Sequence, residues 1–253
     1  MKITYNNQTI DFYNFRIASR QILVSLSGGC DSAAAAFLTC KHFPGITLIP
    51  YTARDQNAPK DADAAEQIVK WLQSRFPKTN IHNLQIFEFN DRTEDFVSFK
   101  ECKRAIKGTK RFNKLNKTQV SKILQLDKIS QSMINQHPNA VRLDGMTLNP
   151  PIEDMKKLGF YKIAERRRDK EEEERPQLLI GINNNIIYQP WANVDKKFVA
   201  DIFKKNNLMD TLFPLTRSCV GTAKQTDNFT RECHSCFWCW EKKWAFDLEW
   251  SDK

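Results

Sequence analysis

The feature that most constrains the fold of this chain is the six-residue segment 27–32, which reads Ser-Gly-Gly-Cys-Asp-Ser. An apolar run, residues 21–26, precedes it, and an alanine-rich stretch, residues 33–40, follows it. A short apolar run that ends at a glycine pair predicts a strand and a turn, and alanine is the strongest helix former. The segment is therefore predicted to be a tight loop that joins a strand to a helix.

The residues of this loop suit a phosphate group. Two consecutive glycines let the backbone turn sharply and bring its N–H groups up to an oxyanion, because no Cβ stands in the way. The serine hydroxyls add donors, and the positive end of the following helix points to the same place. We predict that the loop binds pyrophosphate or the phosphate tail of ATP. The binding residues would be Ser27, Gly28, Gly29, Cys30, Asp31 and Ser32.

An ordinary strand-to-helix turn, with Asp31 as the N-cap residue, is the alternative to a phosphate loop. The order Ser-Gly-Gly-x-Asp-Ser, however, resembles the PP-loop of the ATP pyrophosphatases. It is not a Walker A pattern, which ends in a phosphate-binding lysine, because this loop contains no lysine. The resemblance implies that the loop holds the β and γ phosphates as a leaving group while the α phosphorus is attacked. Cys30 fills the variable position, and we do not expect a catalytic thiol there.

The pattern of the first ninety residues predicts the fold class. Strand-like segments at 21–26, 46–51 and 84–89 are separated by helical segments such as 61–76. This alternation predicts a doubly wound α/β fold with a mostly parallel sheet covered on both faces. The length of 253 residues fits one domain that spans residues 1–253.

A second loop is expected beside the phosphate site. Residues 139–143 are predicted to return to the sheet, and residues 144–151 follow as a loop. Loops after the strands of α/β sheets hold ligands. The candidates to contact the nucleotide or base are therefore Gly145, Thr147 and Asn149. A purely structural turn is the alternative.

The formal charge of +9 is concentrated in a polar stretch, residues 96–137, whose apolar residues have helical spacing. We predict a basic helical insertion there. Its basic residues include Lys103, Arg104, Lys107, Lys110, Arg111, Lys114, Lys117 and Lys122. The insertion could hold a nucleic acid or a nucleotide, but the chain lacks an aromatic RNA-binding sheet motif and a DNA-binding zinc finger. A solvated helical arm is therefore favoured over nucleic-acid binding.

The sequence contains no run of eighteen apolar residues. Its N-terminus also lacks the apolar segment of a signal peptide. We therefore expect a cytoplasmic protein with no membrane partner.

Four of the seven cysteines lie near the C-terminus with the spacing Cys-x13-Cys-x2-Cys-x2-Cys. They are Cys219, Cys233, Cys236 and Cys239. Four thiolates at this spacing predict a tetrahedral structural zinc site that pins the segment 216–246. An iron–sulfur cluster is the rival, because it also takes four cysteines, and His234 could replace one thiol.

The phosphate loop and the four cysteines together resemble the 7-cyano-7-deazaguanine synthases, the queuosine-pathway family of PP-loop ATP pyrophosphatases. The resemblance implies an adenine nucleotide α-hydrolase-like fold. Three further stretches carry it: Asp195-Lys196-Lys197-Phe198-Val199, Thr216-Arg217-Ser218-Cys219 and Trp244-Ala245-Phe246. It covers both ends of the chain and leaves the middle loose.

The resemblance implies a reaction. The carboxylate of 7-carboxy-7-deazaguanine would attack the α phosphorus of ATP to give an acyl adenylate and pyrophosphate. Ammonia would then displace AMP to give an amide, and a second activation would dehydrate the amide to the nitrile. Asp31 would be the link to Mg²⁺, and Lys196 would reach phosphate or substrate. A solvated surface lysine is the alternative for Lys196.

Three other functions stay open. A sulfur-transferring enzyme, similar to a phosphoadenylylsulfate reductase, would use a reactive cysteine, with Cys30 or Cys102 as the candidates. A tRNA-modifying PP-loop enzyme would use the basic insertion, and a nucleotide-sensing module of a defence system would act on a partner protein. No glutaminase segment is visible, so ammonia would come free or from a partner. A homodimer is the default oligomer.

Overall fold

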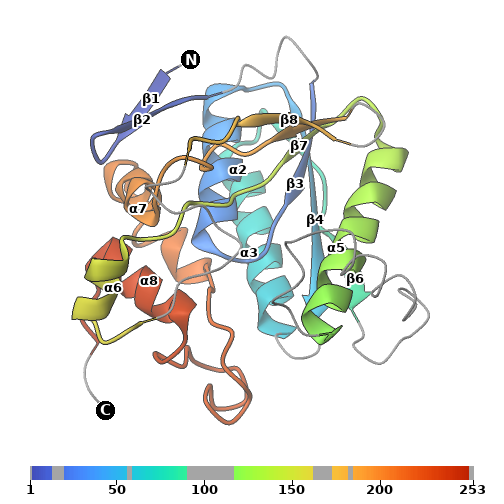
Figure 1. Cartoon of the computed structure of the whole chain (residues 1–253). Coiled ribbons are helices and arrows are strands. Elements are labelled where there is room, and N and C mark those ends of the chain that lie inside the picture. Colours follow the sequence, from blue (N-terminus) through green and yellow to red (C-terminus); the bar gives the residue numbers. More distant parts are fainter. Residues whose placement is uncertain are drawn as a thin grey trace.

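A mostly parallel sheet lies at the centre of the fold (Figure 1). The computed structural model describes residues 2–12, 20–55, 59–89, 117–161, 173–181 and 185–250. Within them the sheet has seven strands in the order β5-β4-β3-β7-β9-β8, and β6 also pairs with β4. The strands are β3 (Gln21–Ser25), β4 (Thr47–Asp55), β5 (Asn80–Ile81), β6 (Gln85–Phe89), β7 (Val141–Leu143), β8 (Leu178–Ile180) and β9 (Ile186–Tyr188). Every pairing is parallel except that of β8 with β9, so the predicted fold class is confirmed.

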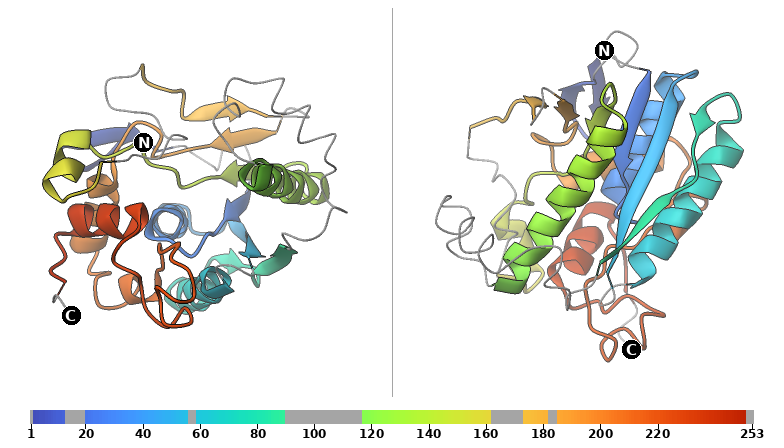
Figure 2. Two further views of the ribbon diagram at one scale, coloured as in Figure 1. Left: turned by 60° about the horizontal axis from the view of Figure 1, so that its bottom comes forward. Right: turned by 90° about the vertical axis from the view of Figure 1, so that its right-hand side faces the viewer.

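The chain reverses its direction of travel across the sheet between β3 and β7. It runs outward from β3 through β4 to β5 and β6, and then returns to the other side of β3 as β7. The helices α2 (Cys30–His42) and α3 (Pro59–Arg75) cover one face, and α5 (Lys117–Gln136) covers the other (Figure 2). In α/β sheets, ligands bind at the carboxyl ends of the strands where the order reverses. The loops after β3 and β7 meet at this point.

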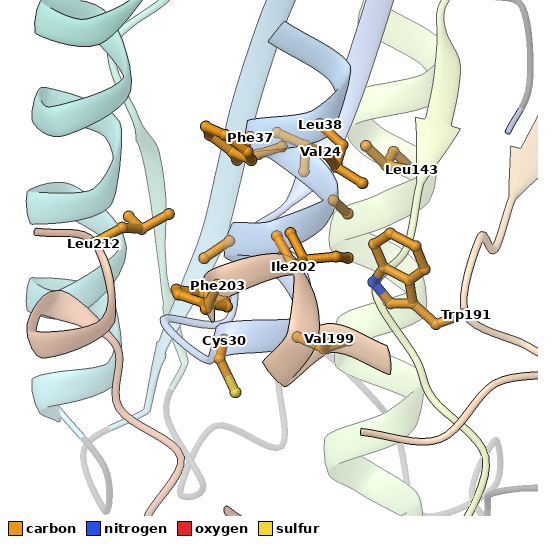
Figure 3. Packing of buried hydrophobic residues seen from close by; sticks show 14 of the residues in the cluster. Val24, Cys30, Phe37, Leu38, Leu143, Trp191, Val199, Ile202, Phe203 and Leu212 are labelled. Carbon is orange, nitrogen blue, oxygen red and sulfur yellow. The ribbon is translucent and has the colours of Figure 1, made fainter. Parts of the chain in front are cut away.

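The central unit forms because its apolar residues are buried on every side. Ile22, Leu23 and Val24 of β3 have no exposed surface, as expected for a strand covered on both faces. The four alanines of α2, residues 33–36, are also fully buried. Their small side chains let α2 lie between the sheet and α7 (Lys196–Lys205). Figure 3 shows Val199, Ile202 and Phe203 of α7 in this core beside α2.

The helix α5 packs directly on the second face of the sheet. Ile129, Met133 and Ile134 are buried in one cluster with residues of β3 and β4. The hydroxyls of Tyr51 on β4 and Ser130 on α5 are hydrogen-bonded at 2.9 Å. This described half of the predicted 96–137 insertion is therefore a helix that connects β6 to β7 along the sheet. Residues 90–116, with most of the predicted basic patch, lie outside the described residues, and the boundaries of the insertion stay a prediction.

A hairpin at the N-terminus, which the sequence did not lead us to expect, packs on α7. Its strands are β1 (Lys2–Tyr5) and β2 (Gln8–Asp11). The turn residues Asn6 and Asn7 have positive φ values of 46° and 56°, which suit the two-residue turn of a hairpin. The backbone N–H of Asn6 donates to Asp201 on α7 at 2.7 Å, and the ring of Tyr5 packs edge-on against Phe198.

The C-terminal part packs against α7 on the side away from the hairpin. It contains the short 3-10 helix η3 (Phe213–Leu215) and α8 (Phe237–Phe246). The helix α6 (Ile152–Lys157), which precedes α7 in the chain, packs against α8. The rings of Phe203 on α7 and Phe246 on α8 are 5.7 Å apart, and the indole N–H of Trp244 donates to Asp154 on α6 at 3.1 Å. In the described part of the chain, no helix is long and apolar enough to cross a membrane.

Candidate functional site

The predicted phosphate loop lies at the carboxyl end of β3, where the strand order reverses. The helix α2 begins at Cys30, and its N-cap residue is Gly29. Asp31 is therefore not the N-cap residue, and the capping role that the alternative of an ordinary turn gave it is wrong. Gly29 has no side chain that could cap the first turn of α2. The N–H groups of such a first turn, together with the helix dipole, are the usual anion-binding groups of a helix start.

The two serines of the loop lie side by side. Their Oγ atoms are 3.3 Å apart, and the backbone N–H of Ser27 donates to the Ser32 hydroxyl at 3.3 Å. The N–H of Gly29 donates to the Ser27 hydroxyl at 3.4 Å. The Ser32 hydroxyl donates to the Gly29 carbonyl at 3.2 Å. Both hydroxyls stand next to the helix start, and Ser32 would have to release the Gly29 carbonyl before it could donate to an anion there.

Three other segments close around the loop. Gly28 has a φ of +78°, and a Cβ on it would overlap the backbone oxygen of Asp61 in α3. A Cβ on Gly145, in the loop after β7, would lie 2.7 Å from the backbone nitrogen of Ser32. The backbone N–H of Arg217 donates to the Gly28 carbonyl at 2.8 Å. These contacts fix the loop from three sides and leave room for nothing larger than glycine at positions 28 and 145.

Lys196 is buried in the site. Only 2% of its surface is exposed, so it is not the solvated surface lysine of the alternative interpretation. Its Nζ lies 3.1 Å from Asp31 Oδ2 and 2.9 Å from Glu241 Oε2. The Lys196 ammonium thus joins two carboxylates that belong to different helices. The indole N–H of Trp191 fixes the same turn by donating to the Asp31 carbonyl at 3.0 Å.

Glu241 is a site residue that the sequence analysis did not identify. It has no exposed surface and belongs to α8, far from the loop in the sequence. The signal that could have found it is its position as the one acid in a helix that contains three tryptophans and two phenylalanines. Arg217, which belongs to the stretch 216–219, is a second such residue, and its guanidinium lies 3.9 Å from the Asp61 carboxylate.

The thiol of Cys30 is poorly suited to act as a nucleophile. The side chain is fully buried, and burial raises the pKa of the Cys30 thiol to about 11. A reactive cysteine needs a lowered pKa and access to its substrate. The other candidate thiol, Cys102, lies outside the described residues.

The loop after β7 meets the phosphate loop at one glycine. Gly145 touches the first turn of α2, whereas Thr147 and Asn149 are 1% and 2% exposed. The backbone N–H of Leu148 donates to the Val194 carbonyl at 3.0 Å, which ties this loop to the segment before α7. The burial of Thr147 and Asn149 favours a structural role for both.

The four C-terminal cysteines form one cluster. The Sγ atoms of Cys219, Cys233, Cys236 and Cys239 all lie within 4.8 Å of one another. Those of Cys233 and Cys239 are 3.9 Å apart, and those of Cys236 and Cys239 are 3.5 Å apart. A tetrahedral zinc ion with Zn–S bonds of about 2.3 Å requires sulfur atoms about 3.8 Å apart. The four thiols therefore fit a structural zinc ion.

The surroundings of the cluster act differently on its thiols, and burial raises the pKa of Cys219. The backbone N–H groups of Gly221 and Cys233 donate to Cys219 Sγ at 3.3 and 3.1 Å. Hydrogen bonding between the thiols of Cys236 and Cys239 lowers the pKa of Cys236 and raises that of Cys239. His234 stacks on the ring of Trp250 at 4.2 Å and is not one of the clustered ligands.

No protein-family model and no curated protein matches the chain. Two solved structures are similar to it in fold. An NMN synthetase from Francisella tularensis is 16% identical, with a TM-score of 0.44 over 94% of this chain and 91% of that one. A phosphoadenylyl-sulfate reductase from Candida auris, in a phosphate complex, is 13% identical, with a TM-score of 0.40 over 74% of this chain and 72% of that one. Likenesses this distant do not bear on function.

Proposed function

We propose that this chain is an ATP-dependent enzyme that activates a carboxylate and releases pyrophosphate. The observation that carries the proposal is the uncapped start of α2, which follows a glycine pair at the strand-order reversal and has two serine hydroxyls beside it. In this proposal the loop residues 27–32 hold the β and γ phosphates. Holding the leaving group in place lowers the barrier through positioning and charge stabilisation, and needs no nucleophilic side chain.

Asp31 is the proposed contact to Mg²⁺. Magnesium prefers carboxylate and phosphate oxygens, and when bound it would neutralise charge on the leaving pyrophosphate. The Asp31 side chain is 13% exposed, whereas that of Glu241 has no exposed surface, so Asp31 is the carboxylate of this cluster that a cation can reach. Lys196 is buried between the two acids, so its proposed role is to orient the Asp31 carboxylate.

The proposed substrate is 7-carboxy-7-deazaguanine, and the proposed product is 7-cyano-7-deazaguanine. The support is the combination of the phosphate loop with four clustered cysteines in the segment 216–246. The substrate carboxylate displaces pyrophosphate from the α phosphorus of ATP, and ammonia then displaces AMP to form the amide. The amide oxygen attacks a second ATP in the same way, and loss of AMP and a proton leaves the nitrile. One turnover thus consumes two ATP and yields two AMP and two pyrophosphate.

Zinc has a structural role in this proposal. The four thiols would hold the ion and leave no position for a substrate, so its contribution is to fix the C-terminal segment.

The function is tested by incubating the protein with ATP, Mg²⁺, ammonia and a panel of deazapurine acids, followed by mass spectrometry. We expect a nitrile product, with AMP and pyrophosphate formed only when the acid is present. A double variant, Ser27→Ala with Ser32→Ala, should lose this activity, whereas Ser74→Ala on the exposed side of α3 should keep it.

Other results would redirect the assignment. Pyrophosphate release that depends on tRNA or on a protein, and not on the acid, would refute the proposed substrate but keep the proposed chemistry. Sulfur transfer through Cys30 is disfavoured by the burial of that thiol.

A further inference from the structure

The buried carboxylate of Glu241 calls for an explanation. A charged group without exposed surface is costly unless it is paired. Its partner Lys196 is itself buried and also contacts Asp31, near the end of the phosphate loop. The three side chains thus form a continuous connection from α8, through the first residue of α7, to the first turn of α2.

We propose that Glu241 is a positioning residue that couples metal binding at the four cysteines to Mg²⁺-nucleotide binding at the phosphate loop. The proposal rests on the proposed function only in taking the loop as a nucleotide site. It assigns Glu241 a role in cation binding and gives the cysteine cluster an effect on the nucleotide site.

The first link between the two sites runs through α8. Cys236 is the N-cap residue of α8, and Cys239 and Glu241 follow in its first two turns. A metal ion bound to Cys236 and Cys239 fixes both the position and the rotation of this helix start. It therefore also fixes the carboxylate of Glu241 relative to Lys196. Figures 1 and 2 show α8 beside α7 and the loop end of α2.

The second link runs through the other end of the cluster. Cys219 directly follows Arg217 and Ser218, and the backbone N–H of Arg217 holds the Gly28 carbonyl at 2.8 Å. The Ser218 hydroxyl lies 3.5 Å from the point where a Cβ on Gly29 would stand. One metal ion would therefore join two segments that each contact the phosphate loop.

A third contact ties these two segments together. Glu232, next to Cys233, accepts the backbone N–H of Ser218 at 3.4 Å and pairs with Lys242 on α8 at 3.0 Å. Lys242 is 6% exposed, so this pair is also shielded from water. Displacement of either segment would break contacts on both.

The charge of Glu241 has its own effect on cation binding. Lys196 is shared between the carboxylates of Asp31 and Glu241. Without the negative charge of Glu241, the Lys196 ammonium would act on Asp31 alone, and the attraction of this site for Mg²⁺ would fall. A purely structural ion pair would affect stability but would not change the dependence of nucleotide binding on Mg²⁺.

The experiment measures binding of α,β-methylene-ATP by calorimetry as a function of Mg²⁺. It compares zinc-loaded protein with protein stripped by a chelator, and circular dichroism monitors folding. We expect the stripped wild-type protein to bind the nucleotide at least about tenfold more weakly. By thermodynamic reciprocity, the nucleotide should raise the affinity for zinc by the same factor.

The variant Glu241→Gln separates positioning from folding. It should still bind one zinc ion, but it should need about tenfold more Mg²⁺ for half-maximal nucleotide binding and should lose most of the coupling. The matched control Glu249→Gln changes an exposed acid beyond the end of α8 and should behave as wild type.

The outcomes distinguish the two proposals. If the zinc-loaded wild-type protein does not bind the Mg²⁺-nucleotide at all, the proposed function fails. If it binds, but zinc-loaded Glu241→Gln shows the wild-type Mg²⁺ dependence, the positioning role is overturned while the proposed function stands. This second comparison remains decisive even if the stripped protein unfolds.

Discussion

Replacing Gly28 with alanine should displace the phosphate loop, and the same replacement at Gly45 should not. Both glycines have a positive φ, 78° and 88°, so alanine costs about 1–2 kcal/mol of backbone strain at either position. At Gly28 the new Cβ would also overlap the backbone oxygen of Asp61 and lie 3.1 Å from the Cβ of Ala64. At Gly45 no described atom lies within 4 Å of the new Cβ.

The difference between the two variants isolates the contact between the loop and α3. Overpacking against backbone adds about 1–3 kcal/mol, so Gly28→Ala should lose about 2–5 kcal/mol of unfolding free energy and Gly45→Ala about 1–2 kcal/mol. Urea unfolding followed by tryptophan fluorescence measures both losses. Because the clash moves the loop, Gly28→Ala should also weaken Mg²⁺-ATP binding at least tenfold in calorimetry. Equal stability losses, with wild-type nucleotide affinity in Gly28→Ala, would refute this account of the loop.

Three further predictions concern the thiols and the N-terminal hairpin. Purified protein should contain one zinc ion per chain by atomic spectroscopy. Cys236→Ser should weaken zinc affinity by more than about 100-fold, because loss of a zinc ligand costs more than loss of a residue that only hydrogen-bonds to a ligand. Full zinc retention by this variant would argue against the metal site. Burial raises the pKa of Cys30 to about 11 and that of Cys40 to about 12, so neither thiol should react with iodoacetamide in the native protein at pH 8, as mass spectrometry can check. Burial alone would raise the pKa of Asp201, but hydrogen bonds from Lys205 and from the backbone of Asn6 outweigh it and hold the pKa below its usual value. These hydrogen bonds to Asp201 should stabilise the protein by about 1 kcal/mol above the unfolded-state pKa near 4, and this stabilisation should be lost as the pH falls through the folded-state pKa. Asp201→Asn should therefore lower the unfolding free energy at pH 7, and much less at pH 3, as measured by urea unfolding.

Local signals predicted the centre of the fold well. The apolar run before the glycine pair is β3, and the alanine-rich stretch is α2. Both were predictable because the local sequence of each element is almost entirely apolar, which is typical of buried elements. The strand predicted at 46–51 extends as β4 to Asp55, and the residues become polar at the carboxyl end of this strand. The two strands of the N-terminal hairpin were missed because each has four residues and only alternate side chains are buried.

The candidate site was predictable only where its residues are adjacent in the sequence. The six loop residues and the four cysteines each form a local pattern, and the structure places each group together. The pairing of Lys196 with Glu241 joins residues on two different helices, so no local pattern specifies it. The edge hairpin of β8 and β9 was missed because each of its strands has only three residues, too few to show a periodic pattern.

The central claim is that residues 27–32 hold the pyrophosphate part of ATP while the α phosphorus is attacked. The most direct test is to identify the nucleotide products formed by the zinc-loaded protein with ATP, Mg²⁺, ammonia and 7-carboxy-7-deazaguanine. The account predicts AMP and pyrophosphate in equal amounts, with none formed by the variant that lacks both loop serine hydroxyls. Formation of ADP and phosphate, or turnover that survives loss of both hydroxyls, would contradict it.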